Sequence, residues 1–243
     1  IISSILLALK LSVGSFIVDM ANNGIEIMWR NMECISVYKF FDPFNKTPAV
    51  YIKFRYCPHW DPVVYKGEIE AYTKQRLALL RWLYRHMPEE EFYAKVNFVR
   101  LLKLSEYEEF VKKHNLKPLV AEIIVFTKDG KFFEQGGGPG DVAELLSKYS
   151  ERLRIMAEMR PWYFQGITLD DLEIVVGSFG IKANASLLYR LQQDPLVYLV
   201  DVGPRDIVLS YKAMGYAVYG PVVEDLVILI LPRVTIGAYW KNI

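Results

Sequence analysis

The chain has 243 residues, of which 52% are hydrophobic and 14% aromatic. This composition excludes a disordered chain and allows one large domain or two small ones. The 29 basic and 28 acidic residues leave a formal net charge of +1, so we expect no long-range field that would draw the protein to nucleic acid or to anionic lipid, and no nucleic-acid partner.

The chain has two cysteines, Cys34 and Cys57, and three histidines, His59, His86 and His114. Two cysteines are too few for a disulfide-rich scaffold or a zinc site built from thiolates. The histidines show no metal-ligand spacing with each other or with the cysteines. We therefore expect neither a structural metal nor a cofactor.

Residues 1–18, IISSILLALKLSVGSFIV, are apolar apart from Lys10. We expect an apolar helix here, within a lead-in that covers residues 1–30. The length is marginal for the roughly 20 residues that cross a bilayer. Three locations stay open for this helix: a membrane, the core of its own domain, and neighbouring subunits of an assembly.

Two tripeptides, Asn45-Lys-Thr and Asn184-Ala-Ser, match the acceptor pattern for N-glycosylation. Together with the leader-like first residues they favour an extracytoplasmic protein that is secreted or membrane-attached. In that location Asn45 and Asn184 are candidate glycosylation sites.

The elements follow in chain order. A short strand is predicted over residues 35–41, and the alternation in AVYIKFRY predicts a second strand that stops before Pro58. Apolar residues at helical spacing predict a long helix over 63–86. FYAKVNFVRLLKL reads as a strand, and Ser105 with Glu108 matches a capping box for a short helix over 106–115.

The segment VAEIIVFTKDGKFFEQG predicts a β-hairpin that turns at Gly130. The run Gly136–Gly140 lacks the lysine and hydroxyl of a P-loop, so its pattern does not favour phosphate binding. Asp141 is expected to cap a helix over 142–159.

Residues 159–243 are predicted to form a smaller α/β unit with strand, helix, strand order, in which LDDLEIVVGSFG is either a helix start or a strand. Within it, the apolar run LVILIL is expected to be a central strand. The loop DVGPRD places Asp201, Arg205 and Asp206 at the carboxyl end of a strand, where α/β folds bind ligands. These three residues are a candidate ligand site.

The order of elements over residues 48–153 resembles the thioredoxin-like fold, most closely over 96–138. The resemblance implies an α/β domain over residues 31–158, with a mixed sheet flanked by helices. The tetrad Cys57-Pro58-His59-Trp60 stands at the redox motif, with tryptophan in place of the second cysteine, and Ala121 replaces the cis-proline. The resemblance therefore implies a fold without dithiol exchange.

Three interpretations of Cys57 stay open: a reactive thiolate beside His59, a disulfide with Cys34, or a free cysteine without a role. The favoured function is a redox-degenerate, thioredoxin-like binding or structural protein rather than an enzyme. One alternative is a self-assembling cell-surface or filament subunit that uses the apolar N-terminal helix. Another is a monothiol oxidoreductase that uses Cys57. The expected partners are another protein or further copies of the chain, with membrane contact through residues 1–18.

Overall fold

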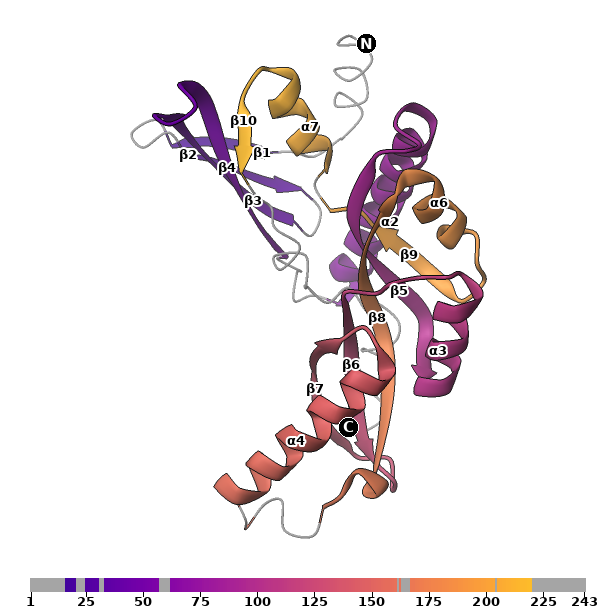
Figure 1. The fold of residues 1–243 in the computed structure, drawn as a ribbon. Coiled ribbons are helices and arrows are strands. Elements are labelled where there is room, and N and C mark those ends of the chain that lie inside the picture. Colours follow the sequence, from indigo (N-terminus) through magenta and orange to yellow (C-terminus); the bar gives the residue numbers. More distant parts are fainter. Residues whose placement is uncertain are drawn as a thin grey trace. The chain divides into compact units, whose positions relative to one another are not determined.

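The computed structural model describes residues 16–20, 25–30, 33–56, 62–160, 162, 167–203 and 205–219, and among these it places the side chains of residues 35–53 and of all from 67 onward except Phe132. These residues have a mixed α/β fold with two five-stranded sheets and five α-helices. Figure 1 shows the elements.

The described chain divides into two compact units. Unit 1 contains the residues up to Met87 and those from Asp201 on, and unit 2 contains Pro88–Val200. Unit 1 is therefore built from two separate segments of sequence. The sequence analysis instead placed boundaries near residues 30 and 158.

Unit 1 contains one sheet with the strand order β1-β2-β3-β4-β10. Strands β1 to β4 are antiparallel neighbours, and β10 pairs with β4 in parallel. The elements are β1 (Phe16–Met20), β2 (Ile25–Arg30), β3 (Glu33–Asp42), β4 (Thr47–Tyr56), α2 (Pro62–His86), α7 (Arg205–Ala213) and β10 (Ala217–Tyr219).

The expected N-terminal helix does not extend over residues 16–20, which form β1. Phe16, Ile17 and Val18 are aromatic or β-branched and favour strands, and their backbone pairs with β2. Residues 1–15 lie outside the described residues. Within the described chain, no helix is both long and apolar enough to cross a membrane.

The core of unit 1 lies between its sheet and α7. Ile35 and Val37 of β3 and Val50 and Ile52 of β4 are fully buried, and they pack against the apolar side of α7. Alternation along each strand puts these four side chains on one face of the sheet. We call this the inner face, and the opposite one the outer face.

Unit 2 contains a sheet with the order β7-β6-β8-β5-β9, in which β8 pairs antiparallel with both β5 and β6. Its elements are β5 (Glu91–Lys103), α3 (Leu104–Lys113), β6 (Val120–Thr127), β7 (Phe132–Pro139), α4 (Val142–Met159), η1 (Leu169–Asp171), β8 (Leu172–Asn184), α6 (Ala185–Gln192) and β9 (Val197–Asp201). An aromatic cluster of Phe98, Tyr107, Phe110 and Phe179 joins α3 to β5 and β8.

The predicted hairpin is confirmed as β6 and β7, with Gly130 at φ 83° in the turn. Asp141 caps α4 as predicted, accepting a hydrogen bond of 2.9 Å from the backbone N–H of Glu144. The capping box before α3 was placed two residues too late. Glu106, rather than Glu108, accepts from the N–H of Lys103, because the helix already begins at Leu104.

The glycine run has a packing explanation. Residues 136–139 form the second half of β7 rather than a loop at a helix start. A Cβ on Gly138 would overlap Leu145, and one on Gly140 would overlap the backbone carbonyl of Pro118. Close approach of neighbouring atoms therefore requires glycine at these two positions.

The strands of the thioredoxin-like segment are divided between the two sheets. Thr47–Tyr56 belongs to the sheet of unit 1 and Glu91–Lys103 to the sheet of unit 2, whereas the resemblance implies one mixed sheet. The segments after residue 159 are also divided. Strands β8 and β9 complete the sheet of unit 2, while α7 and β10 join unit 1. The run LVILIL lies outside the described residues.

Candidate functional site

The candidate thiol site lies largely outside the described residues, because these do not include Cys57, His59 and Trp60. Cys34 is in β3, where its backbone pairs with Arg55 of β4. A Cys34–Cys57 bridge requires that the strand of Cys34 lies beside the strand that precedes Cys57, and β3 and β4 are such neighbours. The bridge and the reactivity of Cys57 both stay predictions.

The loop DVGPRD brings two of its three predicted ligand residues to a buried arginine of α2. Arg76 is fully buried, and its Nε lies 3.3 Å from Oδ1 of Asp201. Its Nη1 lies 3.9 Å from Oδ1 of Asp206. Tyr72 lies one helical turn earlier, with its ring 4.6 Å from the guanidinium carbon.

Asp201 is the centre of this cluster. Its Oδ2 accepts a 2.5 Å hydrogen bond from the Tyr72 hydroxyl, and its Oδ1 accepts one of 2.8 Å from the N–H of Gly203. Gly203 has φ 64°, a left-handed conformation that glycine adopts at low cost. Tyr72, Gly203 and Arg76 all contact this one carboxylate. The cluster therefore holds the loop that follows Asp201 against α2 within unit 1.

Arg205 contributes to this loop through its backbone, since its N–H donates to the carbonyl of Gly203. Tyr72 and Arg76 were not predicted from the sequence as partners of Asp201. The available signal was an arginine within the apolar stripe of a predicted helix, because a charge at such a position needs a buried counter-charge.

The two candidate glycosylation residues are both hydrogen bonded. Asn45 is exposed in the turn between β3 and β4, and its Nδ2 donates 2.7 Å to Asp42. Asn184 caps α6 by accepting from the N–H of Leu187 at 2.9 Å. Modification of either residue stays a prediction.

The outer face of the unit 1 sheet carries a group of partly exposed aromatic side chains. The register places Tyr38 of β3 and Tyr219 of β10 directly beside Tyr51 of β4, and Phe40 follows two residues after Tyr38. Ring centroids lie 6.1 Å apart for Tyr38 and Tyr51, and 5.8 Å apart for Phe40 and Tyr219. We call these four residues the outer aromatic face.

These aromatics are exposed to a degree that is unusual for their type. Phe40 is 44% exposed, Tyr51 41% and Tyr219 39%. Helix α7 of the same unit packs on the inner face and does not cover them.

Comparisons with family models, with curated proteins and with solved structures found no match.

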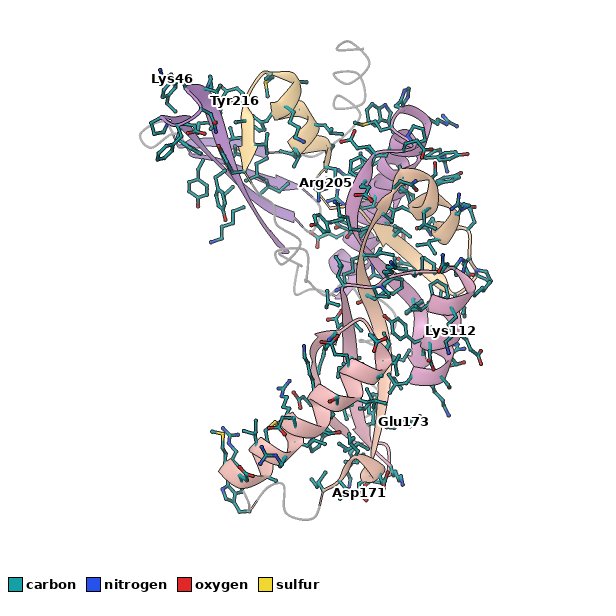
Figure 2. All side chains as sticks on the ribbon, viewed as in Figure 1. Lys46, Lys112, Asp171, Glu173, Arg205 and Tyr216 are labelled. Atoms are coloured by element: carbon teal, nitrogen blue, oxygen red, sulfur yellow. The ribbon has the colours of Figure 1, made fainter. Side chains whose placement is uncertain are left out.

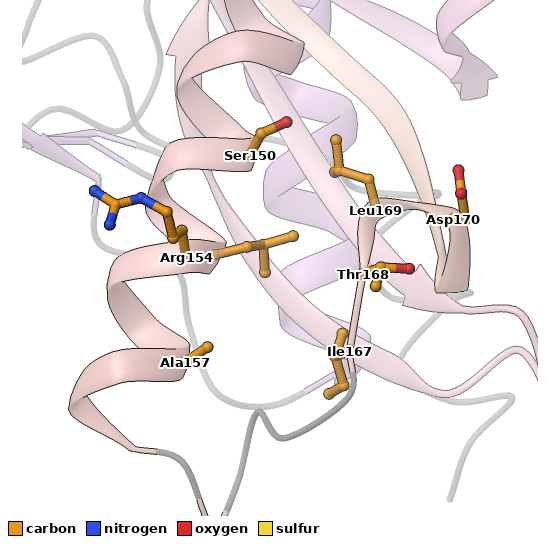
Figure 3. A pocket seen from close by; sticks show the side chains of 8 residues that line it. Ser150, Arg154, Ala157, Ile167, Thr168, Leu169 and Asp170 are labelled. Atoms are coloured by element: carbon orange, nitrogen blue, oxygen red, sulfur yellow. The ribbon is translucent and has the colours of Figure 1, made fainter.

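Unit 2 has a hollow of about 410 Å³ between α4 and the segment before β8 (Figure 3). Three of its four polar lining side chains already have partners, and Asp170 is the fourth. Arg154 pairs with Glu151 and Glu158, Ser150 donates to the carbonyl of Leu146, and the Thr168 hydroxyl donates to Asp171. The hollow therefore offers a ligand little free hydrogen-bonding capacity.

Unit 2 also has a buried polar group across three strands. Lys95 of β5 lies 2.8 Å from Glu122 of β6, and the hydroxyl of Ser178 in β8 donates 2.6 Å to the same carboxylate. All three side chains are nearly or fully buried. Because the Ser178 hydroxyl donates to a carboxylate that is already paired with lysine, the arrangement satisfies buried charges rather than activating a nucleophile.

Across the described ranges, no group of three or more histidine, cysteine, aspartate or glutamate side chains is arranged to hold a metal ion. The outer aromatic face is one feature of these residues that packing within its own unit explains only in part.

Proposed function

We propose that this chain is a binding or structural protein that contacts another polypeptide through its outer aromatic face. The observation that carries the proposal is the exposure of Phe40, Tyr51 and Tyr219 on one side of a sheet whose other side holds the core. Aromatic residues left in water lose the stabilisation that burial would give them.

The chemistry of the face suits a protein partner. Tyrosine and phenylalanine are enriched at the centres of protein interfaces, where they supply large contact areas with few rotatable bonds. Tyr38 and Tyr51 add hydroxyl groups that can bond to a partner's backbone. The sheet beneath is anchored by α7, so the rings are held in place before binding.

The thioredoxin-like relation, the loss of dithiol chemistry and an extracytoplasmic location remain part of this proposal. Their support is the single cysteine in Cys57-Pro58-His59-Trp60 and the two glycosylation tripeptides. The self-assembly alternative is the case in which the partner is a second copy of the chain.

A photo-cross-linking amino acid at position 51, on the outer aromatic face, tests the proposal in cells that produce the full chain. Position 159 is the matched control. Met159 is 75% exposed at the end of α4 and belongs to unit 2, whereas the outer aromatic face belongs to unit 1. Cross-linked products are identified by mass spectrometry.

We expect a discrete cross-linked species from position 51 and none from position 159. Adding Phe40→Lys should reduce the yield several-fold, since a lysine in place of a central aromatic weakens an interface. A product that contains only this chain would identify self-assembly. No discrete product from position 51, or equal products from both positions, would contradict the proposal.

A further inference from the structure

The hairpin of β3 and β4 ends in two strongly exposed phenylalanines. Phe41 is 63% exposed and Phe44 is 93% exposed. Phe44 lies in the turn of residues 43–46, and Figure 2 shows Lys46 at the same end of the hairpin. We call Phe41 and Phe44 the aromatic tip. It is distinct from the outer aromatic face, because Phe41 belongs to the other side of the sheet and Phe44 to the turn.

The turn that presents Phe44 is held in one conformation. Asp42 is 4% exposed and accepts hydrogen bonds from the backbone N–H groups of Phe44 and Asn45, at 2.9 and 3.3 Å. It also accepts from the Asn45 side chain and from the Tyr219 hydroxyl. The Phe44 ring is therefore displayed on an ordered, convex turn.

The exposed charges of residues 35–53 are all positive. Lys46 lies in the turn at the aromatic tip, Lys39 lies with its ammonium 5.9 Å from the centre of the Tyr211 ring of α7, and Lys53 lies at the other end of the hairpin, opposite Ser36. The single acid in this stretch is Asp42, which is buried and fully hydrogen bonded. The hairpin thus shows aromatic and positive groups to its surroundings and hides its carboxylate.

We propose that the aromatic tip docks on the surface of an anionic lipid bilayer. Aromatic rings partition into the interfacial layer, and nearby lysines are attracted to anionic headgroups. A convex tip fits a deformable surface without needing a preformed pocket. This inference goes beyond the proposed polypeptide partner and uses different residues.

The net charge of +1 does not oppose this docking. The attraction acts over roughly one Debye length, about 8–10 Å at physiological salt, so Lys46 in the turn of the tip matters more than distant charges. Insertion of Phe41 and Phe44 supplies the part of the binding that salt does not screen.

Co-sedimentation of the full chain with vesicles tests the inference. One vesicle type is phosphatidylcholine alone, and the other contains one third phosphatidylserine. The variants are Phe44→Ala and Lys46→Glu. The matched controls are Trp162→Ala, where the side chain is 80% exposed, and Lys117→Glu, another exposed lysine.

We expect binding to the phosphatidylserine vesicles to fall about fivefold or more in each tip variant and to stay unchanged in the controls. Because Phe44 is highly exposed, we do not expect Phe44→Ala to lose vesicle binding through unfolding. A circular dichroism spectrum of the variant checks that it is folded. Absence of vesicle binding by the wild type would overturn the inference, as would binding that both tip variants retain.

Sedimentation velocity without vesicles tests the alternative that the aromatic tip binds a second copy of the chain. A self-associated species that Phe44→Ala dissociates would assign the tip to a second copy and overturn the lipid assignment. Cross-linking from position 51 is unaffected by loss of lipid binding, so failure of this inference and failure of the proposed function are distinguishable.

Discussion

Asp42 is a buried carboxylate that fixes a turn, and its titration offers a test at the scale of one residue. Its hydrogen bonds, led by the one from Tyr219 and opposed by burial, lower the pKa of Asp42 from 3.8 to about 2. Because the folded pKa lies below the unfolded value, the charged form stabilises the fold above about pH 4. This contribution is lost as the pH falls through about 2.

We expect Asp42→Asn to be less stable than the wild type at neutral pH, because the amide keeps one acceptor oxygen and loses the charge. The difference should shrink as the pH falls from about 4 to about 2. Urea unfolding measured across this range checks it, with Asp170→Asn, an exposed acid, as the control. A stability difference that does not change with pH would contradict the expectation.

The buried pair of Arg76 and Asp201 gives a second prediction. Arg76→Met leaves Asp201 buried without its arginine, which typically costs about 3–5 kcal/mol of unfolding free energy. Asp201→Asn should also destabilise unit 1. The double variant should cost at least about 1 kcal/mol less than the sum of the single variants, because the two groups interact directly.

Denaturant unfolding of the four proteins in this cycle measures the coupling. Strictly additive costs would show that the 3.3 Å contact between Arg76 and Asp201 contributes no coupling to stability.

At the scale of an element, two glycines of the run, Gly137 and Gly140, should respond differently to substitution. A Cβ at Gly140 would overlap the Pro118 carbonyl, which is backbone and cannot rotate away. We expect Gly140→Ala to cost about 1–3 kcal/mol. At Gly137 the nearest atom to an added Cβ lies 3.9 Å away, so Gly137→Ala is the control and should be nearly neutral. Thermal unfolding of both variants measures these two changes in stability.

Local sequence signals predicted most elements of the described chain. Alternation predicted β4, helical spacing predicted α2 within one residue, and Gly130 and Asp141 predicted the hairpin turn and the α4 cap. Each of these depends on neighbours in sequence. The segment that forms β8 stayed ambiguous, because a strand apolar on both faces has no clear period.

Pairing between distant strands was not predictable in the same way. In the pairing of β10 with β4, Val218 lies beside Val50, which is 168 positions earlier in the chain. Nothing in the sequence of residues 217–219 or of residues 49–51 indicates that the two segments pair. The outer aromatic face was missed for the same reason, since Tyr219 joins Tyr51 only through this pairing. Sequence spacing alone identified Asp201 and Asp206 but not Arg76, which lies on another element.

At the scale of the whole molecule, the long connection in unit 1 predicts an order of folding. The hairpin of β6 and β7 closes a short loop, whereas β10 can pair with β4 only after the chain of unit 2 has been spanned. Loop closure costs more entropy for longer loops, and non-local pairing is slow.

We therefore expect amides of residues 120–139 to become protected from hydrogen exchange before those of 217–219 during refolding. Pulse labelling with mass spectrometry of peptides checks this order. Simultaneous protection of the two regions would contradict it.

The path of the chain through unit 2 bears on how this unit could be gained or lost in evolution. Asn97 of β5 bonds to the carbonyl of Leu199, and the N–H of Val99 bonds to that of Leu196, so β5 and β9 run in opposite directions (Figure 1). The chain thus enters and leaves this unit at the same end of its sheet. A segment with adjacent ends can be gained or lost in one genetic event without rerouting its host. Chains that keep unit 1 and carry a short loop in place of residues 88–200 are therefore an expected form of this architecture.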